Sequence, residues 1–265
     1  MENQLSKAVS GAAMRKCRIV ARLDVKNDHV IKGIHLEGLR KVGNPNEMAM
    51  QYYSQGADEI FFMDAVAAYY DRNNLKEILN KACENIFIPI TVGGGIRTIN
   101  DIQDALSAGA DKVAINTKAV MDPDFIREAA EVFGSQCIVV SIDAKRQSDL
   151  KWEVFIGNGR EPTGLDVVEW SRQCELLGAG EIMLTSIDKE GTKRGFDLDL
   201  NKSVSEAVSI PIISSGGAGN GEDILRLLKE VRVDAVAVAS LIHYNIMEIE
   251  SLKKNLIEGG IKVRV

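Results

Sequence analysis

The chain has 265 residues, close to the ~250 typical of a single α/β barrel, and its 45% hydrophobic and 26% charged residues are ordinary for a globular enzyme. A net charge of -6 with scattered basic residues argues against nucleic acid or an anionic membrane as a partner, and no apolar run approaches the ~20 residues of a membrane span. Four separate cysteines and three separate histidines predict a cytoplasmic protein with reduced thiols and neither a metal nor another cofactor.

Short apolar runs alternate with longer helical patterns along the chain, which is typical of parallel strand–helix units. The pattern begins near Lys16, so we expect residues 1–15 to be a disordered leader or a cloning remnant and residues 16–265 to form one domain. Most runs are nearly all apolar, as in strands that are buried on both faces. The predicted strands are 17–25, 59–64, 88–92, 112–116, 137–142, 181–185, 211–215 and 235–239. Eight strands in this length favour a closed (β/α)8 TIM barrel over an open doubly wound sheet.

The connections between these strands carry the predicted helices, and two of them are longer than the rest. Asp122 precedes Pro123, which predicts a helix start with Asp122 as the N-cap. Residues 26–45 predict a long loop that covers the mouth of the barrel as a lid. Residues 146–163 predict an inserted hairpin around Gly157, which could also fold over the mouth.

The two halves of the chain repeat one another. The segments LDVK and SIDAK end the first and fifth predicted strands with Asp24 and Asp143, which are 119 residues apart. The glycines Gly95 and Gly217 follow the third and seventh predicted strands at a spacing of 122 residues. The segments GADEI and GAGEI, and GADKVAINT and RVDAVAVAS, recur in the same order. The chain is therefore predicted to be a doubled half-barrel with its seam near Gly134.

Paired carboxylates are the predicted catalytic groups. The active site of a TIM barrel lies at the carboxyl ends of its strands, and the repeat places Asp24 and Asp143 there on opposite sides of the mouth. A single strand-end aspartate often only caps a loop, but two related by the repeat suit general acid and base work. From the long segment that follows the first strand, we select Lys32 as the third catalytic candidate.

Each half also contains a predicted phosphate cradle. Glycine runs 93–95 and 216–217 follow apolar strands, so that backbone N–H groups can approach a phosphate closely. Glycines are common in turns, but two matched runs, each with polar or small residues after the next strand, are stronger evidence. Those following residues are Asn116, Thr117, Ala239 and Ser240. We therefore expect a small substrate with two phosphates.

Many segments resemble the cyclase subunit of imidazole glycerol phosphate synthase, from about Lys16 to the C-terminus. They include LDVK, VIKG, TVGGGIR, GADKVAINT, PTGLD, EGTK, SSGGAGN and ASLIHY. The resemblance implies that Asp24 and Asp143 are the catalytic acid and base and that Lys32 is the family's loop lysine. It implies one phosphate site at Gly95, Asn116 and Thr117, and the other at Gly191, Gly217, Ala239 and Ser240.

The resemblance also implies a partner and a reaction. Ammonia from a glutaminase subunit, bound as a heterodimer, would enter at the bottom of the barrel and attack a phosphoribulosyl-formimino aminoimidazole carboxamide ribotide. The products would be imidazole glycerol phosphate and aminoimidazole carboxamide ribotide, which makes the chain a carbon–nitrogen lyase. The family's ammonia gate corresponds to Arg18, Glu59, Lys112 and Glu181. Asp111 and Gln136 match positions on the face that docks the glutaminase.

Four residues depart from the family's pattern near the mouth. Arg22 replaces a small residue, Val66 and Ala68 replace two hydroxyl side chains, and Glu190 replaces an aspartate. These departures leave an alternative in which the chain receives ammonia but amidates a surface-sugar precursor. A sister isomerase of the same pathway would not need the gate or the docking residues. A silent barrel that only activates the glutaminase would not need both aspartates and both cradles.

Overall fold

The structure is a computed structural model that describes residues 16–65 and 75–264. Eight parallel strands close into a barrel in the order β10-β11-β12-β1-β4-β5-β6-β7, and β7 pairs with β10 to complete the circle. The barrel strands are β1 (Arg18–Lys26), β4 (Glu59–Asp64), β5 (Ile90–Gly93), β6 (Lys112–Ile115), β7 (Ile138–Ser148), β10 (Glu181–Ser186), β11 (Ile212–Ser215) and β12 (Ala235–Val238). The predicted TIM barrel is confirmed.

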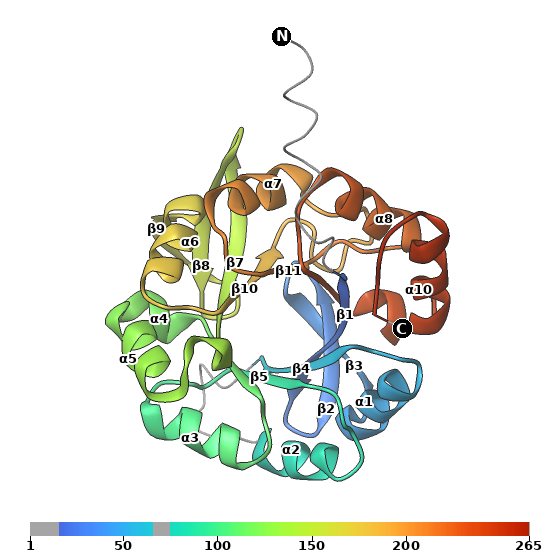
Figure 1. Ribbon diagram of the computed structural model, residues 1–265, viewed down its shortest axis with the longest axis horizontal. Helices are drawn as coiled ribbons and strands as arrows, with labels where there is room; N and C mark the ends of the chain where they lie inside the picture. Colours follow the sequence, from blue (N-terminus) through green and yellow to red (C-terminus); the bar gives the residue numbers. More distant parts are fainter. Residues whose placement is uncertain (1–15, 66–74, 265) are drawn as a thin grey trace.

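Helices surround these strands as an outer ring (Figure 1). They are α1 (Pro45–Ser54), α2 (Leu75–Cys83), α3 (Ile99–Ser107), α4 (Thr117–Met121), α5 (Asp124–Phe133), α6 (Val167–Leu176), α7 (Leu198–Ala207), α8 (Gly221–Glu230), α9 (Ser240–His243) and α10 (Ile249–Glu258), and a 3-10 turn lies at Ser135–Cys137. The predicted N-cap at Asp122 is wrong, because α5 begins at Asp124 with Pro123 as its N-cap and no side-chain cap. The Asp122 carboxylate instead pairs with Lys118, one turn earlier, at 2.9 Å.

Alternation along the strands divides the apolar core into two parts. The larger part lies between the strands and the helices, and it contains Ile19, Ile60 and Ile182 among many others. The smaller part fills the interior of the barrel with Val20, Phe61, Ala114, Val139, Met183, Ile213, Ala235 and Ala237. Along each strand, every second side chain points into the barrel. Inward side chains two residues before this layer, such as Arg18 and Glu59, therefore meet at the bottom of the barrel, and those two residues after it, such as Arg22, meet at the mouth.

The predicted lid loop at 26–45 is wrong, since this segment is an antiparallel hairpin of β2 (His29–Ile34) and β3 (Glu37–Gly43). β1 continues beyond the barrel, turns at Asn27 with φ 55°, and pairs with β2. The β-branched Val30 and Ile31 favour this extended conformation. The second insertion also extends a barrel strand: β7 pairs with β8 (Lys151–Ile156), and β8 pairs with β9 (Glu161–Asp166) across the turn at Gly157.

Within the two stretches that the structure describes, no helix has the length and apolarity needed to cross a membrane. The same residues include no group of three or more histidine, cysteine, aspartate or glutamate side chains placed to hold a metal ion. The leader predicted at residues 1–15 lies outside the described residues. So do Val66 and Ala68, two of the four departures from the family's pattern.

Candidate active site

Asp24 and Asp143 lie at the mouth of the barrel, on β1 and β7, and both are buried. A third buried side chain, Arg22, comes from the same strand as Asp24. Its Nε donates to Asp24 Oδ1 at 2.9 Å, and its Nη1 donates to Thr185 Oγ1 at 2.9 Å and Ser215 Oγ at 3.1 Å. The electrostatic influence of Asp143 also favours the charged guanidinium. The two predicted catalytic carboxylates therefore share one central cation.

The two aspartates have different proton affinities. Burial raises the pKa of Asp143 to about 6, because the stabilising charge of Arg22 is opposed by the negative charge of Asp24. Burial alone would also raise the pKa of Asp24, but Arg22 and Lys32 outweigh it and hold that pKa below its ordinary value. Asp24 is therefore ionised near neutral pH, while Asp143 titrates close to it. This difference suits a site that needs a carboxylate and a proton donor together.

Lys32 lies on strand β2, and its side chain is buried. Its Nζ forms an ion pair with the carboxylate of Glu190 and lies 3.8 Å from Asp24 Oδ2. Burial lowers the pKa of Lys32 to about 8, and the positive charge of Arg22 lowers it further, against the effect of Asp24. The lysine is thus a cation held by Glu190, at the edge of the mouth and close to one of the two aspartates.

His243 and Tyr52 lie beside this group and were not singled out from the sequence. The hydroxyl of Tyr52 lies 2.8 Å from His243 Nδ1, and the two rings stack with centroids 5.7 Å apart. Burial and the charge of Lys32 lower the pKa of His243 to about 4, so the ring is neutral near pH 7. Thr185 and Ser215 were missed as well. The alternation that turns Asp143 inward also turns these strand-end hydroxyls inward, so a signal for them was present in the sequence.

The phosphate cradle of the first half borders a cavity of about 400 Å³. Gly95, Asn116 and Thr117, the three predicted phosphate residues of this half, all line it, together with Arg22 and Asp143. Asn116 Nδ2 donates to Asp143 Oδ2 at 3.2 Å, and Gly95 has a φ of 75° that suits glycine. The predicted cradle and one of the two predicted catalytic aspartates therefore open into the same space.

The cradle of the second half is almost closed. Gly191, Gly217, Ala239 and Ser240, its four predicted residues, border a cavity of only about 20 Å³. Lys32 and Glu190 border it too, so their ion pair lies against the cradle. Gly191 packs so closely that a Cβ there would clash with the backbone oxygen of Gly33. The four residues are thus brought together, but around a carboxylate-containing ion pair rather than an open space.

The four residues matched to the ammonia gate form a closed ring of alternating charge at the opposite end of the barrel. Arg18 pairs with Glu59 at 2.8 Å and with Glu181, while Lys112 pairs with Glu59 at 3.1 Å and with Glu181 at 2.9 Å. Thr91 Oγ1 donates to Glu59 at 2.5 Å. Their side chains are between 1% and 18% exposed, so each charge depends on its neighbours.

The residues matched to the docking face are exposed near the bottom of the barrel. The carboxylate of Asp111 accepts a hydrogen bond from the backbone N–H of Ile90 at 2.8 Å, which helps to hold the start of β5. Gln136 Nε2 donates to the backbone oxygen of Phe133 at 3.4 Å. Phe87, in the connection before β5, is a nearly fully exposed aromatic side chain at 79%. Asp111 thus has a structural role within the barrel, which is independent of any partner that docks there.

The two hairpins meet above the mouth. Leu36 from the β2–β3 hairpin, Phe155 from β8 and Ile187 from the loop after β10 form a small buried apolar cluster. His35 N–H donates to the backbone oxygen of Glu190 at 2.8 Å, which ties the first hairpin to that loop. The mouth is therefore partly covered from both halves by ordered strands rather than by a free loop.

Comparison with known proteins agrees with this architecture. The model of the family described as Histidine biosynthesis protein matches residues 18–248. The imidazole glycerol phosphate synthase subunit HisF of Legionella pneumophila is 60% identical over 210 residues, which cover 79% of this chain and 99% of that protein. Proteins of the same name from Lactococcus lactis subsp. cremoris, strains MG1363 and SK11, are 48% identical over 249 residues, covering 94% of this chain and 96% of theirs. The chain therefore belongs to the histidine biosynthesis protein family, among the HisF subunits of imidazole glycerol phosphate synthase.

Proposed function

We propose that the chain is a cyclase that uses ammonia from a glutaminase subunit to convert the phosphoribulosyl-formimino aminoimidazole carboxamide ribotide. The products are imidazole glycerol phosphate and aminoimidazole carboxamide ribotide. The observation that carries the proposal is the presence of a charged ring at one end of the barrel and paired carboxylates at the other. A barrel that served no partner would have little reason to keep four costly charges at its bottom.

The roles of the aspartates follow from their surroundings. Asp24 is ionised and lies next to Lys32 and Arg22, so it accepts a proton or stabilises the cation that forms when ammonia adds to the substrate. Asp143, with a pKa of about 6, keeps a protonated fraction near neutral pH and donates a proton to the leaving nitrogen. Asn116 orients the Asp143 carboxyl group through its 3.2 Å hydrogen bond.

Binding is assigned to the two cradles. One phosphate of the substrate would occupy the open cavity at Gly95, Asn116 and Thr117. The other would occupy the second cradle at Gly191, Gly217, Ala239 and Ser240, where the ion pair between Lys32 and Glu190 must first separate. The glutaminase would dock at the bottom of the barrel around the ring, on the face that includes Asp111 and Gln136.

The gate is tested by comparing two nitrogen sources. Lys112→Met removes the cation that joins Glu59 to Glu181. We expect the glutamine-dependent rate with a cognate glutaminase to fall far more than the rate with added ammonium salt. Lys229→Met, on the exposed face of α8, serves as the matched control. Equal losses with glutamine and with ammonium would make the ring a structural device and remove the main support for the proposal.

A second candidate reaction is favoured by two of the departures from the family's pattern. Arg22 fills the centre of the mouth, and Glu190 places a carboxylate against the second phosphate cradle. Both features suit a substrate with fewer phosphates, as in the amidation of a surface-sugar precursor. Complementation of a histidine auxotroph that lacks the cyclase distinguishes the two candidates. Growth supports the histidine reaction, whereas failure of a well-expressed chain to complement supports the sugar reaction.

A further inference from the structure

The Arg22 guanidinium has a donor that the protein does not use. Nε binds Asp24, and Nη1 binds both Thr185 and Ser215. Among the residues that the structure describes, Nη2 makes no hydrogen bond. Arg22 is only 3% exposed, yet it lines the cavity of about 400 Å³ at the first cradle. The unused donor therefore belongs to a cation in the cavity wall, where an oxygen of a bound ligand could accept a charge-assisted hydrogen bond from it.

The arrangement holds the guanidinium in a fixed position. Thr185 and Ser215, from two different barrel strands, secure Nη1, while the carboxylate of Asp24 secures Nε. A residue that only neutralised Asp24 would not need the two hydroxyls. Held at three points, the planar group presents its remaining edge in one direction, which is the geometry used to recognise carboxylates.

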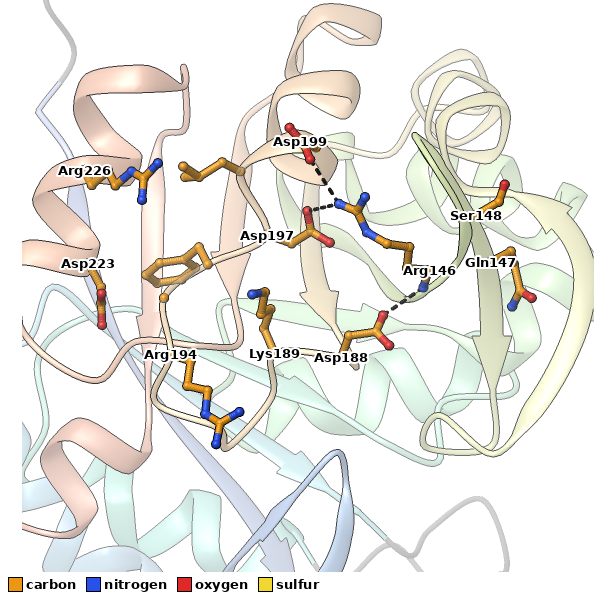
Figure 2. Close-up of a pocket in the computed structure, with 13 residues that line it drawn as sticks. Arg146, Gln147, Ser148, Asp188, Lys189, Arg194, Asp197, Asp199, Asp223 and Arg226 are labelled. Atoms are coloured by element: carbon orange, nitrogen blue, oxygen red, sulfur yellow. Dashed lines mark hydrogen bonds and ion pairs between the residues drawn. The ribbon is translucent and has the colours of Figure 1, made fainter.

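The larger cavity beside the mouth provides a contrast. It measures about 820 Å³, and Arg146 lines it between Asp197 and Ser148 (Figure 2). There the guanidinium binds groups of the cavity wall. Its Nη2 donates to Asp197 at 2.8 Å and to Asp199 at 3.2 Å, and its Cζ lies 4.8 Å from the ring centroid of Trp152. Arg146 thus has carboxylate partners from the cavity wall and an aromatic ring beneath it, whereas the free edge of Arg22 has neither.

We propose that Arg22 is a specificity-determining residue that binds an oxygen of a ligand, most tightly a carboxylate, beside the phosphate held in the first cradle; this goes beyond the cyclase reaction, whose substrate carries a carboxamide and no carboxylate. A singly charged carboxylate fits better than a second phosphate, because the negative charges of Asp24 and Asp143 both act on Arg22 and would repel a more highly charged anion. The second cradle already contains the carboxylate of Glu190, so a single phosphate is the anion that enters without rearrangement. The inference rests on the first cradle as a phosphate site, but not on the use of ammonia.

Matched pairs of small ligands test this inference. Each pair has one phosphate and differs only in a carboxylate or a primary alcohol at the other end: 2-phosphoglycolate with 2-hydroxyethyl phosphate, 3-phosphoglycerate with glycerol 3-phosphate, and 4-phosphoerythronate with erythritol 4-phosphate. Calorimetric titration at neutral pH gives each affinity. We expect the acid of at least one pair to bind wild-type protein about 10-fold more tightly than its alcohol, as for a hydrogen bond between charged groups.

Variants assign the preference to Arg22. Arg22→Met should abolish the preference while leaving the affinity for the alcohols unchanged, which also shows that the cradle is intact. Arg22→Lys keeps the charge without the planar fork, so it should lose most of the preference, and it decides the question if the Met variant does not fold. Arg146→Met removes the same net charge from the larger cavity and should keep the full preference.

Two results would overturn the proposal: no acid preferred in any pair by the wild-type protein, or a full preference retained by a folded Arg22 variant. The outcome is separate from that of the proposed function. A chain that prefers the acids but fails in every ammonia assay keeps Arg22 as a binding residue and loses the reaction. A chain that is an active cyclase without the preference loses only this inference.

Discussion

The two halves of this barrel share a backbone but differ in their cradles. Gly95 and Gly217 both have positive φ angles, 75° and 112°, at repeat-related turns. Yet the first cradle opens into about 400 Å³, whereas the second has about 20 Å³. The difference comes from side chains, since the ion pair of Lys32 and Glu190 borders only the second. The repeated backbone therefore provides two equivalent glycine cradles, and the side chains around each cradle determine whether it has space for an anion.

The two halves also differ in the pKa of their aspartates, which is lowered for Asp24 and raised for Asp143. Removing either carboxylate should have the largest effect on the rate of all the substitutions considered. Asp24→Asn and Asp143→Asn should each lower kcat by about 10²–10⁴-fold, the usual contribution of an acid or base. Asp143→Asn should also remove the pH dependence near 6 from the rate profile, because that is the pKa to which burial raises the group. Steady-state kinetics with saturating ammonium measure both effects. Asp104→Asn, on the exposed face of α3, is the control, and near-normal activity in either aspartate variant would remove that residue from the mechanism.

The raised pKa of Asp143 also predicts a dependence of stability on pH. The folded protein binds the Asp143 proton more tightly than the unfolded chain does, so the linked stability is present below pH ~4 and is lost as the pH rises through about 6. Asn cannot ionise. Asp143→Asn should therefore gain stability relative to wild type between pH 4 and 7, by ~3 kcal/mol at most. Urea unfolding across this range measures the difference in the free energy of unfolding between the variant and wild type. A difference that does not change with pH would mean that ionisation of Asp143 does not destabilise the folded protein.

Glu190→Gln should make the second cradle more like the first. The substitution removes the negative charge beside Gly217 and weakens the hold on Lys32, whose ammonium group then becomes available to an anion. We expect the affinity of this cradle for inorganic phosphate to increase about 10-fold, comparable to one charged hydrogen bond. Calorimetry should then detect a second phosphate site. Glu258→Gln, at the exposed end of α10, is the control, and an unchanged stoichiometry would show that Glu190 does not limit the second cradle.

Local patterns predicted the barrel, because its strands and helices depend on residues close in sequence, while the roles predicted for its site residues stay predictions. Apolar runs predicted the eight barrel strands, and period-two alternation correctly places Lys112 and Asp143 at opposite ends of the interior. The β2–β3 hairpin was missed, since its turn at His35 and Leu36, with φ of 52° and 63°, is not visible in the hydrophobic pattern.

The role of Arg22 could not be predicted from local patterns for a different reason. Its partners Thr185 and Ser215 are 163 and 193 residues away along the chain, and only closure of the barrel brings them together. The same applies to the ion pair between Lys32 and Glu190, which spans 158 residues. The sequence showed that Arg22 and Glu190 depart from the family's pattern. The contacts that these two side chains make arise only in the folded barrel.

The smallest expected effect concerns the helix starts that follow the two glycine runs, where the halves agree. Thr98 caps α3 in a capping box with Asp101, and Asn220 caps α8 in the same way with Asp223. Each side-chain cap satisfies a backbone N–H that would otherwise have no partner in the first turn of its helix.

Replacing either N-cap residue should therefore lower the free energy of unfolding by the same amount. We expect Thr98→Ala and Asn220→Ala each to lower the free energy of unfolding by about 1 kcal/mol, as is usual for the loss of an N-cap. The two sites share no hydrogen bond, so the effects should add in the double variant. Urea unfolding at a single pH measures all three variants. A cost that differs by more than ~1 kcal/mol between the two single variants would exceed the normal range for caps. It would show that the asymmetry of the cradles extends into the scaffold, rather than residing in the side chains of Lys32 and Glu190.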